Sequence, residues 1–502
     1  MEPEQVPLIP EERPSRPLAK DRPWGIAHAV LLCVSVALGS VYCATSPLGN
    51  LKQLSHLDDP KRCPLEDPHT TALPLRESEP DSSSSEAWHA LSYVLITTCA
   101  CVALSTALIA LLVRLPLAAT WVVIATQALA PALASLALFA HGSVYPGLGL
   151  LAFSSVVAFF LYLWRSHISL SGELLRLSAL ALNARRGLAG IAVLSQVGRI
   201  AVAALLGVFA LAALASGSLM PNPDRLGVDP DSGECIGSKN NSSNGDDAVV
   251  VPCCTWEVKT PAAITIGLLA GSLTWTLLLV TELKRFGISA VCISWYHDGR
   301  MTAMKGLKSA FKHGYGTCAL SALVMWVAET LRSIAESMRR DATEQGGMGG
   351  FCAMLLAPIV DSISQLLEAF TRFALSYAAG NATRVAGFMH ASQECRQLLS
   401  QRLMNTFAVY FFPPLVVHAF SFIMALVFGL SFYLFVGDAV IAALSGATAL
   451  AALSILSSVL IDAIDAIYVA YAMDETGEWQ EVAEVMHKLP TQPPEQRNIS
   501  EL

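Results

Sequence analysis

The chain has 502 residues, of which 54% are hydrophobic and only 14% are charged. Because soluble domains carry about 25% charged residues, this composition excludes an ordinary soluble globular protein. The formal net charge of −8 says little about partners, since the acidic residues gather mainly in the hydrophilic segments 58–86 and 224–247 and after Met473.

The apolar residues are gathered into ten runs, and a helix needs about 20 such residues to cross about 30 Å of hydrocarbon. The runs are residues 27–44, 88–113, 118–140, 144–164, 188–219, 262–280, 318–327 with its flanks, 351–379, 407–436 and 439–472. They are continuous rather than alternating, which excludes a membrane β-barrel. We therefore predict an all-α fold, a polytopic transmembrane helical bundle of about ten spans.

Basic residues predict the orientation, because cytoplasmic loops are enriched in Lys and Arg. Arg13, Arg16, Lys20 and Arg22 precede the first run, so we place the N-terminus in the cytoplasm and expect no cleaved signal peptide. Alternation then gives a cytoplasmic segment 1–23, a first span 24–44, an extracellular loop 45–87, three spans in 88–164, a cytoplasmic amphipathic segment 165–187, a fifth span 188–217, a second extracellular loop 218–259, a C-terminal transmembrane region 260–472 and a cytoplasmic tail 473–502.

Two segments leave alternatives open. Arg332, Arg339 and Arg340 fall on the outer side, so they belong either to the end of a long helix or to a misdrawn eighth span. Residues 168–186 mix leucines with Glu and Arg, which indicates either an interfacial amphipathic helix or an extension of the fifth span.

The second extracellular loop contains Cys235, Cys253 and Cys254 together with two overlapping N-x-[ST] triplets at Asn240 and Asn241. In an outer loop these residues predict a disulfide from Cys235 to Cys253 or Cys254 and an N-glycan on one of the two asparagines. Such triplets also occur by chance, which leaves an unmodified loop as the alternative.

An enzyme should carry a cluster of nucleophile, base or metal ligands. The sequence has no H-E-x-x-H, no Walker loop and no G-x-S-x-G, and its eleven histidines are scattered. We therefore expect neither an enzyme nor a cofactor nor a metal site, and no nucleic-acid partner.

Charged residues inside membrane helices are costly and usually face a cavity or a partner. The candidates are Arg199, Glu282, Glu329, Asp361, Glu368, Asp462 and Asp465. Glu282 adjoins Lys284 and Arg285, which favours an interfacial position. Asp462 and Asp465 share one helix face, so either one is protonated or both meet a cation, unless both lie in headgroup water.

Aromatic residues in or beside the spans are the other candidate site. They are Trp275, Trp295, Tyr296, Trp326, Tyr377, Tyr410, Tyr468 and Tyr471. Most such residues form interfacial belts, but several around one cavity would make a cation–π cage for a quaternary ammonium ion.

Trp275 is followed twenty residues later by Trp295-Tyr296, a pattern that resembles the signature of the choline transporter-like family. Where that family has Gln, Asn, Ala-Gly and Phe, this chain has Leu278, Glu282, Ser289-Ala290 and His297. Two further blocks are similar to family motifs, namely Leu307–Phe311 with Gly316-Thr317, Ser321–Leu323 and Arg332, and Asp465–Tyr468 through Asp474-Glu475. The resemblance covers the C-terminal half, whereas the N-terminal half shares only the layout, and the family's Asn-x-Ala-Tyr block has no clear match near residues 372–388.

The resemblance implies a ten-span transporter, in the plasma membrane or alternatively an organelle membrane, that moves choline or another small organic cation by alternating access. Its lipid-embedded site would comprise Trp275, Glu282, Trp295, Tyr296, Trp326, Asp465 and Tyr468. Pro413-Pro414 and Gly287 are the expected places for helix bending. The alternative is a membrane scaffold or regulator of the same fold without transport activity.

Overall fold

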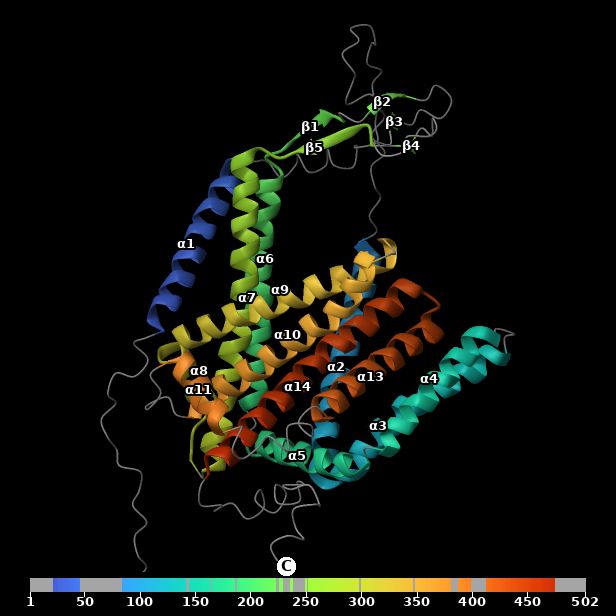
Figure 1. Cartoon of the computed structure of the whole chain (residues 1–502), viewed down its shortest axis with the longest axis vertical. Coiled ribbons are helices and arrows are strands. Elements are labelled where there is room, and N and C mark those ends of the chain that lie inside the picture. Colours follow the sequence, from blue (N-terminus) through green and yellow to red (C-terminus); the bar gives the residue numbers. More distant parts are fainter. Residues whose placement is uncertain are drawn as a thin grey trace, which may run out of the picture. The chain divides into compact units, whose positions relative to one another are not determined.

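The computed structural model describes residues 21–45, 84–140, 144–163, 165–185, 187–222, 225–228, 235–237, 249–250, 252–297, 299–345, 348–380, 387–398 and 412–474 (Figure 1). Within these ranges every predicted span lies on a helix. The bounds are α1 Arg22–Thr45, α2 Ser84–Arg114, α3 Pro116–Ala140, α4 Val144–Leu163, α6 Gly187–Leu214, α7 Thr260–Tyr296, α9 Tyr315–Gln345, α10 Met348–Gly380, α13 Phe412–Val436 and α14 Ala439–Met473. The prediction of an all-α bundle is confirmed.

Eight of these helices are long and apolar enough to cross a membrane, namely α1, α2, α3, α6, α7, α9, α13 and α14. The other two predicted spans are α4, whose apolar stretch Gly147–Phe159 is shorter, and α10, which carries Asp361, Glu368 and Arg372. The predicted count of about ten is roughly consistent with this result. The described residues include three further helices: α5 Arg165–Ala184, α8 Ala303–Lys312 and α11 Phe388–Leu398.

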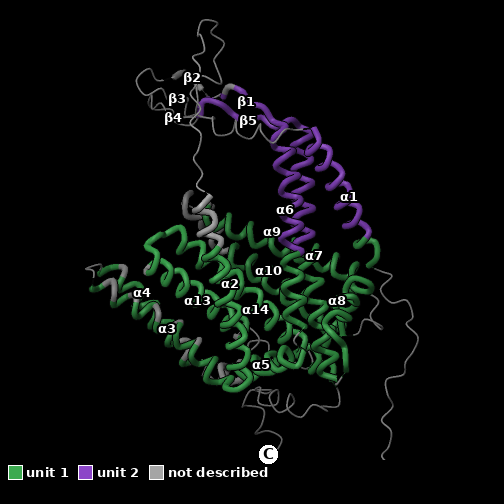
Figure 2. Tube along the Cα trace, turned by 180° about the vertical axis from the view of Figure 1, so that it is seen from behind, with its two compact units in different colours: residues 1–25, 83–197, 278–502 green, residues 26–82, 198–277 purple. Residues whose placement is uncertain are grey.

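The chain divides into two compact units, which are described separately (Figure 2). Unit 1 comprises residues 1–25, 83–197 and 278–502, and unit 2 comprises residues 26–82 and 198–277.

Unit 1 is organised around helix pairs that are consecutive in the chain: α3 with α4, α9 with α10, and α13 with α14 (Figure 1). Helix α14 also packs against α2, α5 and α10, so its second half is the most buried part of the unit. At the crossing of α13 and α14, a Cβ on Gly429 would lie 3.6 Å from Cα of Gly446. Small residues at that crossing let the two backbones approach closely.

Helix α5 is a separate element, because the chain turns at Arg185 before α6 begins. The alternative that residues 168–186 extend the fifth span is therefore wrong. One face of α5, which includes Leu174, Leu175 and Leu182, is buried in the apolar core against α2, α3 and α14.

The arginines at the end of the seventh span lie on α9, a single helix of 31 residues. Arg332 donates a hydrogen bond to Glu368 on α10 at 3.2 Å, and Arg339 contacts Asp361 at the same distance. The structure thus supports the first alternative, in which these arginines belong to the end of a long helix. It also pairs them with acidic residues of the neighbouring helix.

Neither place where bending was expected interrupts a helix. Helix α7 runs for 37 residues through Gly287 without a break. The close approach to α8 depends on Gly306, since a Cβ there would lie 2.8 Å from the carbonyl oxygen of Gly287. Pro413 and Pro414 lie in the first turn of α13, where proline costs no backbone hydrogen bond.

Asp21, the residue before α1, contacts two other elements of unit 1 through its carboxylate. Asp21 is buried, accepts a hydrogen bond from the Thr317 hydroxyl at 2.9 Å and accepts another from the backbone N–H of Phe388 at 2.6 Å. Phe388 is the first residue of α11, so Asp21 caps that helix from a distant part of the chain.

In unit 2, α1 contacts α6 and α7. Gly39 lies against the ring of Phe209, and His28 packs edge-on against Trp275 and hydrogen-bonds Thr276 at 3.1 Å. Beyond α6 the chain forms two small antiparallel sheets from the strands β1 Ser218–Pro221, β2 Arg225–Val228, β3 Cys235–Gly237, β4 Val249–Val250 and β5 Cys254–Glu257.

A disulfide joins Cys235 to Cys253, with their Cα atoms 5.3 Å apart, and Cys254 is disulfide-bonded as well. The bridge ties β3 to the start of β5. Asn240 and Asn241 lie outside the described residues, so the glycan stays a prediction.

Candidate functional site: a buried ionic network

Three charged residues occupy one turn of α7 and are all buried. Glu282, Lys284 and Arg285 are exposed by only 1%, 7% and 5%. The interfacial position expected for Glu282 stays a prediction. The spacing of three residues places Glu282 and Arg285 on one helix face, and Nη1 of Arg285 donates to Oε1 of Glu282 at 2.5 Å.

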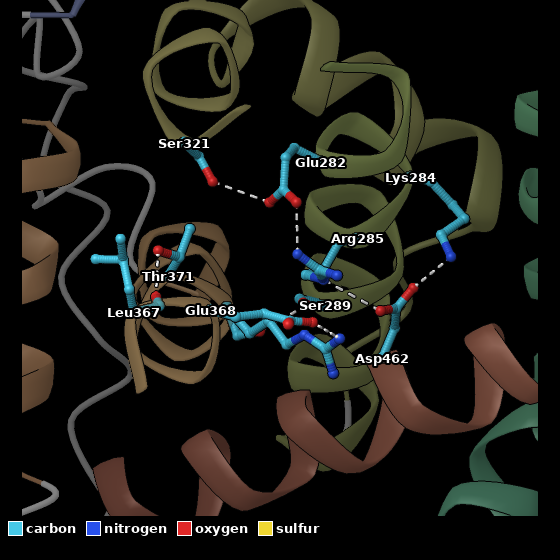
Figure 3. A network of polar contacts seen from close by, with 11 residues as sticks. Glu282, Lys284, Arg285, Ser289, Ser321, Leu367, Glu368, Thr371 and Asp462 are labelled. Atoms are coloured by element: carbon cyan, nitrogen blue, oxygen red, sulfur yellow. Dashed lines mark hydrogen bonds and ion pairs between the residues drawn. The ribbon is translucent and has the colours of Figure 1, made fainter. Parts of the chain in front are cut away.

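Asp462 on α14 completes this network from another part of the chain. Its Oδ1 accepts from Nε of Arg285 at 3.2 Å, and its Oδ2 lies 2.9 Å from Nζ of Lys284. The hydroxyl of Ser321 on α9 donates to Oε2 of Glu282 at 2.9 Å. Figure 3 shows these side chains as one continuous chain of contacts between α9, α7 and α14.

Asp465 lies one turn beyond Asp462 and is fully buried. Its negative charge also interacts with Arg285. The network and Asp465 together hold three carboxylates and two cationic side chains, and the charge of Arg372 on α10 also acts on Asp462. The alternative in which these aspartates meet a cation holds for Asp462, which pairs with both Lys284 and Arg285.

A second ionic group lies between α9 and α10. Glu368 accepts hydrogen bonds from Arg332 and from Arg372, the latter one turn further along its own helix. Between α7 and α10 the hydroxyls of Ser289 and Ser376 are 3.0 Å apart. Polar contacts therefore connect α7 to α9, α10 and α14 within unit 1.

The aromatic candidates of unit 1 lie close to this region but differ in burial. Tyr296 and Tyr468 are each 1% exposed and belong to one apolar cluster, against which the half-buried Trp295 also packs. The hydroxyl of Tyr296 donates to Oδ2 of Asp474 at 3.1 Å, and the Tyr468 ring lies 5.7 Å from that of Phe373. These two tyrosines therefore point into protein.

The other two aromatic residues of the predicted site, Trp326 and Trp275, are not part of this cluster. Trp326 is on α9 and is half-buried. Trp275 is in unit 2, where it packs against His28. The structure therefore brings together Glu282 with Asp462, and Tyr296 with Tyr468, but it does not gather all seven predicted residues around one site.

Lys284, Arg285 and Ser321 are the network residues that sequence reasoning missed. The available signal is the spacing of Glu282 and Arg285, which places them on one helix face. Among the described residues, no group of three or more His, Cys, Asp or Glu side chains could hold a metal ion. The carboxylates and aromatic rings of this region are groups that recognise organic cations.

Comparison with known proteins places this arrangement in a family. The model of a family described as plasma-membrane choline transporters matches residues 148–476, about two thirds of the chain. The match includes the whole ionic network, Asp465 and the aromatic residues around it. No curated protein matches the chain. The chain belongs to the plasma-membrane choline transporter family and is a multi-pass integral protein of the plasma membrane.

Proposed function

We propose that the chain moves choline, or a closely related small organic cation, by alternating access, and that the cation passes beside the α7–α14 network. The observation that carries this proposal is the burial of three carboxylates, those of Glu282, Asp462 and Asp465, in one region of unit 1. Carboxylates in a buried, low-dielectric region favour the entry of a cation.

Aromatic rings supply the second element of cation recognition. A quaternary ammonium ion has no proton to donate, so it is held by charge and by ring faces, each worth about 0.5–2 kcal/mol. Tyr296 and Tyr468 lie in the same buried cluster, and Tyr468 is on the same helix face as Asp465. We assign Asp465 and these two tyrosines to the cation path, with Trp295 as its supporting wall.

The network also offers a physical route for alternating access. Arg285 and Lys284 on α7 are joined to Asp462 on α14 by ion pairs, and such contacts exchange partners without breaking the covalent framework. A cation that binds near Asp465 competes with Arg285 for negative charge, which weakens the contact between the two helices. A substrate that binds one arrangement better shifts the equilibrium toward it.

A scaffold or regulator without transport is the second candidate, and one observation favours it. Lys284 and Arg285 already neutralise Asp462 and Glu282, so most of the network is satisfied by the protein itself. In that case the negative charge of Asp465 would serve only to balance the positive charge of Arg285.

Uptake of labelled choline by cells expressing the chain separates these functions, with a panel of amines of different size and charge as competitors. We expect saturable uptake that quaternary amines inhibit and neutral isosteres do not. The informative variant is Asp465→Asn, which should lose most uptake at a matched surface level.

The matched control is Asp438→Asn on the same helix. Asp438 caps α14 by accepting from the N–H of Val440 at 2.8 Å, and asparagine caps a helix equally well. Uptake no higher than in untransfected cells, for every amine tested, would favour the scaffold.

A further inference from the structure

Helix α8 presents three lysines and two large apolar side chains on its outer surface. Its sequence, AMKGLKSAFK, buries Gly306 and Ala310 and leaves Met304 69% and Phe311 56% exposed. Lys305, Lys308 and Lys312 are exposed as well. Basic and apolar residues side by side on a short helix are typical of a surface that contacts acidic lipid.

The positive charge of this surface is not balanced by the protein. Helix α8 contains no acidic residue, and none of its three lysines forms an ion pair within the described ranges. Arg185, in the turn between α5 and α6, adds a fourth cation. Its Nη2 donates to the carbonyl of Gly299 at 2.7 Å, and it has no carboxylate partner in the part of the chain that the structure describes.

An apolar cavity of about 450 Å³ lies directly beside these cations, between the first turns of α6 and α8. Its lining comprises Arg185, Gly187, Gly190, Ile191, Leu194, Thr302, Ala303, Met304 and Leu307. Leu194 and Met304 are exposed, so the cavity is open at one side. Cavities of about 300–1,000 Å³ are the size that binds small molecules.

Two glycines determine the shape of this cavity. A Cβ at Gly187 would lie 2.8 Å from Cβ of Ala303, so the glycine lets α8 approach α6. At Gly190 a Cβ would meet nothing within 4 Å, so its missing side chain leaves the space unfilled. The combination of an open apolar slot and unbalanced cations matches a molecule with an acyl chain and an anionic headgroup.

We propose that the α6–α8 cavity binds an acidic phospholipid, with an acyl chain in the cavity and the headgroup phosphate on Arg185 and the lysines of α8. The proposal is independent of the transported substrate. On the predicted topology α8 lies on the cytoplasmic side, where the leaflet is rich in anionic lipid.

The test uses the full chain, purified in a neutral detergent and titrated with phosphatidylserine or phosphatidylcholine, with bound lipid counted by native mass spectrometry. We expect phosphatidylserine to be retained and phosphatidylcholine to be lost. Replacing all three lysines, as Lys305→Gln, Lys308→Gln and Lys312→Gln together, should weaken binding about a hundredfold, or about fivefold for each charge removed. Lys259→Gln, at an exposed position before α7, is the charge control and should leave binding unchanged.

A second variant tests the cavity without altering charge. Gly190→Leu fills it and should reduce phosphatidylserine binding at least tenfold. Gly198→Leu, on the same helix and also with open space at its Cβ position, is the matched control and should bind normally.

Equal retention of both lipids, or full binding by Gly190→Leu, would overturn the proposal. Displacement of phosphatidylserine by inorganic phosphate would also overturn it, because the site would then recognise a free anion instead of a lipid.

Discussion

Arg285 and Asp462, which are 177 residues apart in the chain, form a hydrogen-bonded ion pair of 3.2 Å in the interior of unit 1. The pair joins the helix that carries the Trp-Tyr motif to the helix that carries Asp465. A buried pair of this kind is weak evidence of net stabilisation, but removing one partner leaves an unpaired charge.

Asp462→Ala should therefore destabilise the protein strongly. Lys284 and Arg285 both lose their ion pair with Asp462, and breaking a buried ion pair costs about 3–5 kcal/mol. The measurement is thermal unfolding of the purified protein, followed by tryptophan fluorescence. Arg176→Ala is the control, since it breaks only the exposed Glu173 pair of 3.4 Å and should cost about 0–1 kcal/mol. Equal melting temperatures for the two variants would contradict the assignment.

The aromatic residues allow a test that separates the ring from the hydroxyl. Tyr296→Phe loses the hydrogen bond to Asp474 but keeps the ring, so the half-saturation concentration for choline should change less than about threefold. Tyr296→Ala and Trp295→Ala remove the ring faces and should raise that concentration severalfold. Choline competition at matched surface level measures both effects. An unchanged value in both alanine variants would remove these residues from the cation path.

The predicted topology can be tested with a glycan and a tag. Asn240→Gln combined with Asn241→Gln should abolish the only N-glycan, visible as a loss of the mobility shift caused by glycosidase. A tag on the C-terminus should bind antibody only after permeabilisation, because we place both termini in the cytoplasm. Antibody labelling of intact cells would show that the orientation is wrong.

Cys395 on α11 should be chemically inert. Burial raises the pKa of its thiol to about 12, so at pH 8 only about one molecule in ten thousand carries the reactive thiolate. Alkylation of the folded protein should be slow and rise about tenfold for each pH unit up to pH 10. Peptide mapping by mass spectrometry measures the rate, and the unfolded protein is the control. Rapid labelling of the folded protein at pH 8 would show that Cys395 is accessible.

The helices could be predicted from the sequence because each span needs a long apolar run, and every run became a helix in the described residues. The site could be predicted only in part. Glu282, Asp462, Asp465, Tyr296 and Tyr468 are candidates from the sequence. The contacts of Asp462 with Lys284 and Arg285 join two distant helices, and no local pattern encodes them. The role of Pro413 is decided by its position in the first turn of α13.

The contact between Asp21 and the backbone N–H of Phe388 spans 367 residues. During synthesis at about 5–20 residues per second, Asp21 leaves the ribosome about 20–70 s before the helix that it caps exists. Over that interval the carboxylate lacks this partner, although its other partner, Thr317, is made earlier. The contact between α11 and the residue before α1 therefore forms late in biogenesis. A chain stalled on the ribosome before residue 388 would lack the hydrogen bond between Phe388 and Asp21.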